Sequence, residues 1–149
     1  MQIHSYTSFK DMPSEAYKSM LKLGDQIFDE NFAHEVEELD PKRKFNLCLF
    51  LAHEGEKVIG FKFGYELTSS KYYSWLGGVD PEFRGQGVAT KLMDAQHEWC
   101  KKQAYEVIQT KTKNKFRSML LLNIRYGFDI TGTFINQKGD FKIILEKKL

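Results

Sequence analysis

Hydrophobic and polar positions follow two different periods along the chain, and each change of period marks a new element. Short runs rich in Val, Ile, Phe and Tyr between turn residues predict strands. They cover residues 2–8, 45–53, 58–67, 72–79 and 105–112, and a closing hairpin covers residues 128–149. Apolar residues spaced three and four apart predict helices. They cover residues 12–32, 33–44, 86–103 and 114–126, the second of them ending near Pro41.

The order of these elements predicts an α/β chain with a mixed sheet of about seven strands and about four helices. Turns at residues 54–56 and at Lys138 and Gly139 join neighbouring strands into hairpins, so the chain is not a series of regular βαβ units. A chain of 149 residues has the length of one domain and is long enough to bury its own core. We therefore expect a single domain over residues 1–149.

Composition narrows the class of protein. Hydrophobic residues make up 42% of the chain and charged residues 28%, which is typical of a soluble globular protein. A net charge of only +2 argues against a dedicated nucleic-acid-binding protein. Residues 1–10 lack the apolar centre of a signal peptide, and no run of 18 apolar residues is present to span a membrane. We expect a cytoplasmic protein without a nucleic-acid or membrane partner.

The two cysteines, Cys48 and Cys100, lie far apart and lack the spacing of a metal site. Their apolar neighbours predict buried free thiols, which suits a reducing compartment. We therefore expect no bound metal.

The stretch VDPEFRGQGVATKLM, residues 79–93, joins the end of a predicted strand to the start of a predicted helix. A helix N-terminus presents unpaired N–H groups and a partial positive charge, so it attracts anions. Gly85 and Gly87 lack Cβ atoms and would let a phosphate approach the backbone. Arg84 adds a guanidinium group suited to phosphate oxygens, and Ala89 keeps the next turn small. The stretch predicts a pyrophosphate site, although a tight helix-capping loop is the simpler alternative.

Two other phosphate motifs fit less well. The Walker motif GxxxxGK[ST] is absent. The dinucleotide pattern GxGxxG is half present, with Thr90 in place of its third glycine and with Glu106 about 20 residues further on. However, five residues including Pro81 separate the strand from the first glycine, and the chain is short for two nucleotide-binding halves.

The sequence RGQGVA, residues 84–89, resembles the (Arg/Gln)-x-x-Gly-x-(Gly/Ala) pattern of the GNAT superfamily of N-acetyltransferases. The preceding VDP, the downstream Gly127-Phe128 pair and the order of elements over almost the whole chain resemble that family too. The resemblance implies a central, mostly antiparallel sheet whose fourth and fifth strands splay apart, with acetyl-CoA as co-substrate.

The resemblance also implies the residues that hold CoA. The backbone of the loop and the first helical turn would bind the pyrophosphate, and this set comprises Gly85, Gln86, Gly87, Val88, Ala89 and Thr90, beside Arg84. The main chain near Val79 would pair with the pantetheine arm, at a β-bulge that we assign to Gly77 and Gly78; close helix–strand packing is the alternative for these glycines. Asn114 and Asn123 match positions that often reach CoA. A basic cluster would lie near the 3′-phosphate; it comprises Lys111, Lys113, Lys115 and Arg117.

The chemistry implied by the resemblance is direct attack of an amine on the thioester, with backbone N–H groups near Val79 stabilising the oxyanion. Two catalytic positions depart from the family. Its usual acid, a tyrosine four residues before the Gly-Phe pair, is replaced by Asn123, with Tyr126 nearby. Its frequent base, a glutamate four residues before the strand-end valine, is replaced by Trp75, and Glu66 is an alternative base if it faces the cleft.

The resemblance implies a small-molecule or peptide amine as the acceptor. The acidic segment at residues 29–40 favours a cationic amine, although a solvated helix face is the simpler interpretation. Several aromatic residues are candidates to line the acceptor site: Phe28, Phe32, Tyr65, Tyr72, Tyr73 and Trp75. The C-terminal hairpin is a candidate homodimer interface.

Two other functions remain open. Because of the two departures, the first is a CoA-binding sensor without efficient catalysis. The second is a nucleotide-dependent oxidoreductase.

Overall fold

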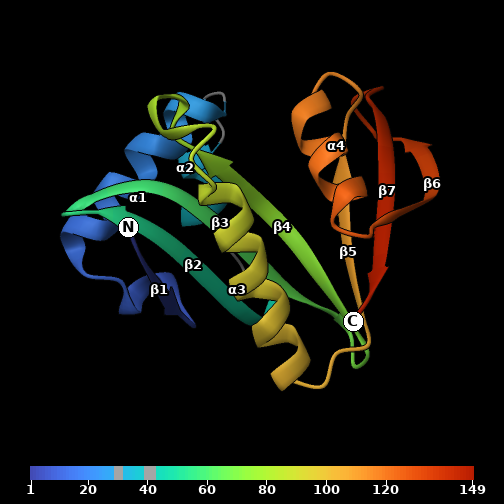
Figure 1. Ribbon diagram of the computed structural model, residues 1–149, viewed down its shortest axis with the longest axis horizontal. Coiled ribbons are helices and arrows are strands. Elements are labelled where there is room, and N and C mark those ends of the chain that lie inside the picture. Colours follow the sequence, from blue (N-terminus) through green and yellow to red (C-terminus); the bar gives the residue numbers. More distant parts are fainter. Residues whose placement is uncertain (29–31, 39–42) are drawn as a thin grey trace.

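The computed structural model describes residues 1–28, 32–38 and 43–149. This part of the chain forms one seven-stranded sheet in the order β1-β2-β3-β4-β5-β7-β6 (Figure 1). The strands are β1 (Gln2–Tyr6), β2 (Phe45–Glu54), β3 (Lys57–Thr68), β4 (Lys71–Val79), β5 (Val107–Thr112), β6 (Asp129–Ile135) and β7 (Phe141–Lys148). The α-helices are α1 (Ser14–Ile27), α2 (Phe32–Glu37), α3 (Val88–Lys102) and α4 (Arg117–Arg125). The predicted fold class is confirmed.

The sheet is antiparallel except where β4 runs parallel to β5. The β4–β5 pairing covers only Lys71 to Ser74 of β4 and ends at the Ser74–Thr110 pair. Beyond this pair the two strands diverge, and Figure 1 shows them meeting near the C-terminus and separating toward their other ends. The predicted splay between the fourth and fifth strands is therefore confirmed.

The β-bulge that starts the splay lies at Trp75. Phe63 of β3 pairs with Leu76 and Gly64 pairs with Ser74, so Trp75 is the extra residue in β4. The assignment of the bulge to Gly77 and Gly78 was wrong, because both glycines pair regularly with β3.

Gly78 instead allows close packing of a helix on the sheet. A Cβ atom at this position would lie only 2.8 Å from Cδ1 of Ile27, the last residue of α1. The alternative interpretation of Gly77 and Gly78, close packing of a helix on the strand, is therefore correct for Gly78.

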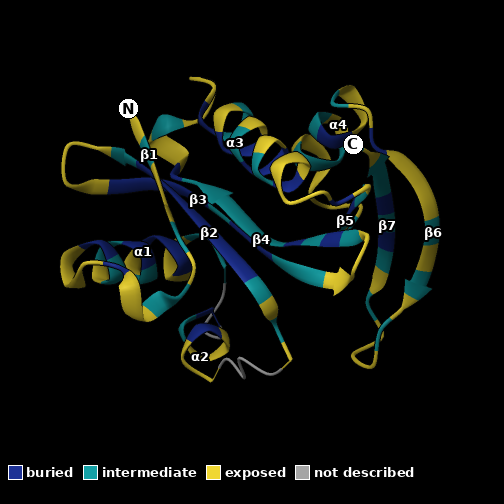
Figure 2. Cartoon of the chain, turned by 90° about the horizontal axis from the view of Figure 1, so that it is seen from below, coloured by how far each residue is buried: buried dark blue, intermediate teal, exposed yellow. Residues whose placement is uncertain are grey.

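Helices cover both faces of the sheet (Figure 2). Successive residues of β3 face opposite sides of the sheet. Phe61 and Phe63 point into the core under α1 and α2, whereas Gly60 lies against Val88 and Leu92 of α3 on the other face. Burying each of these phenylalanines contributes about 1.5–3 kcal/mol. A second core joins α3 to β2, β5 and β7, and it includes the buried free thiols of Cys48 and Cys100. Their predicted burial is confirmed.

Several element ends differ from the sequence prediction. The first helix ends at Ile27 rather than near residue 32, and α4 begins at Arg117 because a turn precedes it, in which the Phe116 amide donates to the Lys113 carbonyl at 3.0 Å. The predicted end of the second helix near Pro41 lies outside the described residues.

The C-terminal hairpin turns around Gly139, as predicted, and leaves β6 at the edge of the sheet with mostly exposed residues (Figure 2). Its role in a dimer stays a prediction. Among the described residues, no helix is both long and apolar enough to cross a membrane.

Candidate functional site

The loop after β4 is fixed by Asp80, which is only 2% exposed. Its carboxylate accepts a hydrogen bond from the Glu82 amide at 3.0 Å and forms an ion pair with Lys57 at 3.2 Å. The backbone hydrogen bond from Glu82, aided by Lys57, lowers the pKa of Asp80. Because the charged form is stabilised, this aspartate holds the one-turn 3-10 helix Pro81–Phe83 that leads toward the two glycines.

Two glycines leave the backbone at the start of α3 accessible. Gly85 and Gly87 have φ values of 78° and 82°, in the left-handed region that favours glycine. No heavy atom beyond their immediate neighbours lies within 4 Å of a Cβ built at either position. Gly87 is the N-cap of α3 and supplies no side-chain hydrogen bond, and the first turn contains no acidic residue. The first N–H groups of the 15-residue helix α3 therefore remain available to an anion.

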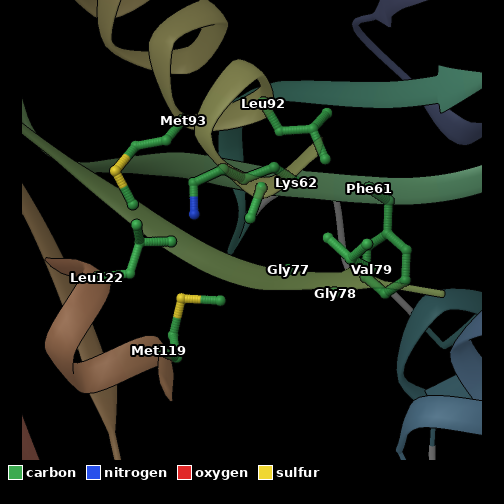
Figure 3. A pocket seen from close by; sticks show the side chains of 10 residues that line it. Phe61, Lys62, Gly77, Gly78, Val79, Leu92, Met93, Met119 and Leu122 are labelled. Carbon is green, nitrogen blue, oxygen red and sulfur yellow. The ribbon is translucent and has the colours of Figure 1, made fainter. Parts of the chain in front are cut away.

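A narrow pocket lies farther in, where the two halves of the sheet separate (Figure 3). Residues from β3, β4, α3 and α4 line it: Phe61, Lys62, Gly77, Gly78, Val79, Ala89, Leu92, Met93, Met119 and Leu122. Its walls are apolar except for the amine of Lys62. Val79 and Ala89 belong both to this lining and to the predicted CoA-binding set, so the pocket continues from the glycine loop along the inner end of β4.

The structure brings the predicted CoA residues of the loop together, but it treats the two asparagines differently. Arg84 and Gln86 are exposed beside the two glycines. Asn123 is 3% exposed and follows Leu122, a pocket residue, on α4. Asn114 is exposed in the connection between β5 and α4.

Tyr126, a candidate acid, is the C-cap of α4 and packs against the core under α3. It is not part of the pocket lining, which on α4 comprises Met119 and Leu122. Tyr126 therefore follows Leu122 by four residues, about one helical turn along the chain, and lies outside the pocket lining.

Glu66, the alternative base, lies at the other end of the sheet. It pairs with Tyr72 in β4, seven residues before Val79, which corresponds to roughly 20 Å of strand. Its carboxylate accepts a hydrogen bond from the Tyr105 hydroxyl at 2.8 Å, and Asn46 Nδ2 donates to that hydroxyl oxygen at 2.6 Å. The structure gives Glu66 a place in this polar network and does not bring it to the pocket.

The predicted basic cluster is divided between different partners. Lys113 forms an ion pair with Asp140 at 3.1 Å. Lys111 lies over the rings of Tyr73 and Phe134, with its amine 5.3 and 5.1 Å from their centroids. Lys111 and Lys113 therefore already have partners in the protein, and the contact of this cluster with a phosphate group stays a prediction.

The opposite face of the splay carries an aromatic patch, made of Tyr65, Tyr73 and Trp75 on β3 and β4. The ring of Tyr65 contacts both of the others edge-on, at centroid distances of 5.3 and 5.9 Å. Lys44 lies over the rings of Tyr65 and Trp75, at 5.1 and 4.9 Å. Two of the aromatic residues proposed for the acceptor site are instead core residues, since Tyr72 is 0% and Phe32 2% exposed.

Lys62 is a pocket residue that the sequence patterns did not predict. Its signal was present, because Lys62 is the one charged residue in the apolar run from Val58 to Tyr65. An isolated lysine in such a run is normally an exposed residue of an alternating strand. Only the pairing of β3 with Gly77 and the approach of α4 place it in a pocket.

Solved structures share this architecture. Ard1 from Thermoplasma volcanium is 19% identical with a TM-score of 0.80, and the alignment covers 99% of this chain and 97% of that chain. A GNAT family acetyltransferase from Elizabethkingia anophelis, solved with acetyl-CoA bound, is 19% identical with a TM-score of 0.72 over the same shares. An aminoglycoside 6'-N-acetyltransferase in complex with coenzyme A is 14% identical with a TM-score of 0.76, again over 99% and 97%.

Because these sequence identities are below 25%, the structural matches show the fold alone. The family is shown by a comparison with family models. No curated protein matches the chain significantly. A family model described as the Acetyltransferase (GNAT) family matches residues 13–127, which is more than half of the chain and includes the glycine loop and the pocket. The chain therefore belongs to the GNAT family of acetyltransferases.

Proposed function

We propose that this protein transfers the acetyl group of acetyl-CoA to an amine by direct attack within a ternary complex. The observation that carries the proposal is the open helix N-terminus behind Gly85 and Gly87, at the mouth of the pocket between the splayed strands. The helix N-terminus suits a pyrophosphate, and the narrow pocket suits a long, thin arm. CoA contains both, joined in that order.

The fit of CoA can be assigned group by group. The backbone N–H groups from Gly85 to Thr90 would bind the pyrophosphate, with Arg84 adding a charge-assisted hydrogen bond. The pantetheine arm would occupy the apolar pocket and pair with β4 near Val79, where no strand of the described residues lies on the β5 side of β4. We propose that Asn123, which follows the pocket residue Leu122 on α4, would contact the arm. Asn114, which is exposed, would contact the outer part of CoA.

The reaction requires a nucleophile, an oxyanion site and a leaving group. The amine nitrogen attacks the thioester carbonyl, and backbone N–H groups of β4 between Trp75 and Val79 would stabilise the oxyanion. The carbon–sulfur bond then breaks and CoA leaves. Among the described residues, no carboxylate lines the pocket, so we propose that water removes the proton from the amine. Holding the two substrates together supplies much of the acceleration.

The acceptor would enter from the face that carries the aromatic patch. The amines of Lys44 and Lys111 lie on that patch, at the point where β4 and β5 separate. Two cations beside three rings favour an acceptor with a negative charge near its amine, rather than the cationic amine that residues 29–40 suggested. Much of that acidic segment, residues 29–31, 39 and 40, lies outside the described residues.

A panel of short peptides tests the acceptor class. The peptides share one sequence and differ only in an acidic, neutral or basic second residue. We expect the kcat/KM for N-terminal acetylation to decrease in that order, and the opposite order would favour the cationic acceptor. A protein that binds acetyl-CoA but acetylates no peptide or small amine in a broad panel would be a CoA-binding sensor, which the loss of the family's tyrosine and glutamate makes the second candidate.

Gly87→Val tests the CoA site itself. Acetyl-CoA should raise the melting temperature of the wild-type protein, because binding at 100 times Kd stabilises the folded state by about 2.7 kcal/mol. The valine would block the open backbone at the helix N-terminus, so the increase should disappear. Gly139→Val is the matched control, since Gly139 has the same φ of 82° and equally open surroundings in the β6–β7 turn. It should retain the increase, whereas an undiminished increase in Gly87→Val would contradict the proposed site.

A further inference from the structure

The side chain of Lys62 occupies the inner part of the pocket. Lys62 belongs to β3 and pairs with Gly77 of β4, which has no side chain to fill the space beside it. A Cβ built on Gly77 would lie 3.6 Å from the amine nitrogen of Lys62. Figure 3 shows this amine pointing into the pocket, between Met93 of α3 and Leu122 of α4. The cation is therefore at the place where the two halves of the sheet begin to separate.

No group in these surroundings compensates the charge of Lys62. Its amine forms no hydrogen bond or ion pair with the described residues. β4 faces it with Gly77 and Val79, and α4 faces it with apolar side chains.

The titratable groups that interact with Lys62 are on α3, and both are neutral. Burial raises the pKa of Cys100 to about 12. Burial, together with the charges of Lys147, Lys62 and Lys101, lowers the pKa of His97 to about 3. Burial of its own amine lowers the pKa of Lys62 to about 8. At pH 7 the ammonium form thus exceeds the free amine by about tenfold.

An ammonium ion in this pocket would lie beside the CoA sulfur. Under the proposed function, the pantetheine arm enters at the glycine loop and runs inward along β4 past Val79. The thioester at its end would then reach the part of the pocket formed by Gly77, Lys62 and Leu122. The departing sulfur carries a negative charge there, away from bulk water, and a fixed cation stabilises such a charge strongly.

We propose that Lys62 is the general acid that protonates the departing CoA thiolate, in the absence of the tyrosine that Asn123 replaces. This inference rests on the proposed function. The acceptor nitrogen forms its bond to the carbonyl carbon, and the carbon–sulfur electron pair passes to sulfur. Lys62 gives one proton to sulfur and becomes a neutral amine. The proton lost by the acceptor nitrogen passes through solvent and restores the ammonium form, so the reaction is balanced.

The proton affinities are suited to this transfer. A free thiol has a pKa of about 8.5, and transfer is most efficient between groups of similar pKa. An ordinary lysine, with a pKa of about 10.4, would hold its proton too tightly. Arginine holds its proton more tightly still, and this difference allows the charge and the proton to be tested separately.

The first experiment measures the thiol of bound CoA, and it requires no acceptor. CoA binding is quantified by calorimetry for the wild type, Lys62→Met and Lys62→Arg. The thiolate of bound CoA is then titrated by its ultraviolet absorbance. At neutral pH we expect about tenfold more thiolate in the wild type and in Lys62→Arg than in Lys62→Met, because only the first two place a cation beside the sulfur. Equal thiolate in wild type and Lys62→Met would overturn the inference.

The second experiment measures kcat with an acceptor from the amine panel. Lys62→Met should lower kcat by at least 100-fold while its affinity for acetyl-CoA stays within threefold, since a general acid contributes about 10²–10⁴-fold. Lys62→Arg should not restore kcat. The wild-type kcat should fall above a pH of about 8, because Lys62 loses its proton there. The kcat of Lys62→Met should show no such decrease at high pH. A kcat in Lys62→Met or Lys62→Arg within threefold of wild type would overturn the role as an acid.

Three outcomes separate the inference from its alternatives. Acetylation of Lys62 itself, detected by mass spectrometry after incubation with acetyl-CoA, would make it a nucleophile and overturn its assignment as the acid. Absence of CoA binding by the wild type would overturn the proposed function and this inference together. CoA binding with an unchanged thiol would overturn the inference alone. The melting temperature of each variant confirms that it is folded; removing an uncompensated buried charge should not lower it.

Discussion

At the residue scale, the proposed CoA site contains one exposed cation and one partly buried cation. Arg84 is exposed on the loop that leads into α3, whereas Lys62 is partly buried and lines the pocket between β3, β4, α3 and α4. Water and salt screen a charge at the surface, whereas a partly buried charge acts through a lower dielectric. We therefore expect Arg84 to contribute to binding and Lys62 to contribute to the chemical step.

Arg84→Ala should weaken the binding of acetyl-CoA by about 1–3 kcal/mol, the scale of a hydrogen bond to a charged group. The loss should be smaller for acetyl-pantetheine, which lacks the pyrophosphate. Calorimetry with both ligands measures the two losses. Arg125→Ala removes the same charge from an exposed position at the end of α4 and should leave both affinities unchanged. Equal losses for the two ligands in Arg84→Ala would show that this arginine supports the loop rather than the phosphate.

Tyr126→Phe should lower kcat by less than tenfold. Tyr126 caps α4 outside the pocket lining, so its hydroxyl is not placed to protonate the sulfur. Steady-state kinetics on the acceptor identified by the panel measure kcat for Tyr126→Phe and, for comparison, for Lys62→Met. A decrease of 100-fold or more at unchanged KM would identify Tyr126 as the acid, because this is the contribution that a general acid makes. Asn123→Ala should instead raise mainly the KM for acetyl-CoA.

At the scale of elements, contact between β3, β4 and α3 depends on residues without side chains. Gly64 pairs with Ser74 beside the bulge, where β4 and β5 stop pairing. A Cβ at Gly64 would lie 2.7 Å from the carbonyl oxygen of Tyr73 and would overlap the ring of Tyr72. The backbone oxygen is fixed by the sheet and cannot move aside as a flexible side chain would. The geometry of the splay therefore depends on Gly64.

Gly64→Ala should lower the free energy of unfolding by about 1–3 kcal/mol, the usual cost of overpacking. Gly132→Ala is the control, because Gly132 also lies in a strand but a Cβ there would meet only Ile144, at 3.7 Å. The control should be neutral or slightly stabilising, since alanine loses less conformational entropy on folding than glycine does. Urea denaturation of both variants measures the difference. Similar stabilities would show that the sheet adjusts freely around position 64.

At the scale of the whole molecule, the splay divides the sheet into two parts whose strands pair only over a short parallel stretch, although one core joins α3 to β5 and β7. β1 to β4 carry α1, α2 and α3, and β5 to β7 lie beside α4 (Figure 1). The β5 side of β4 beyond Ser74 has no strand partner in the described chain. A ligand arm between the two parts would add backbone hydrogen bonds to β4 and would connect residues of α3 to residues of α4.

Acetyl-CoA should therefore slow amide hydrogen exchange in Trp75–Val79, and in the first turn of α3, more than in β2. The physical reason is that the ligand supplies partners to N–H groups that are open in the free protein. Hydrogen-exchange mass spectrometry compares the free and bound wild type with Gly87→Val at the same ligand concentration. Gly87→Val should show no protection, and protection that is uniform across the sheet would argue against an arm inserted beside β4.

The sequence by itself determined the features that depend on neighbouring residues. The periods of apolar residues predict the order of the elements, and two glycines with an arginine between a strand and a helix predict the phosphate loop. The structure confirms the order of the elements and shows the backbone geometry that such a loop requires, because left-handed φ values and a free helix N-terminus are local properties of a few residues. Phosphate binding stays a prediction. The Gly-Phe pair and the family pattern extend the same argument to the family.

Only the tertiary structure decided what distant residues do. Strand register places the bulge at Trp75 instead of at the glycine pair, because a register shift is a property of two paired strands. The alternative base Glu66 lies far from the pocket because the strand register pairs it with Tyr72, seven residues before Val79, and Tyr105, 39 residues away, donates a hydrogen bond to it. In the sequence, Lys62 is only a lysine within an apolar strand. The tertiary structure places Gly77 and Leu122 beside it and makes it a pocket residue. Pairing and packing between strands and helices set the chemistry of that amine, and no local pattern contains this information.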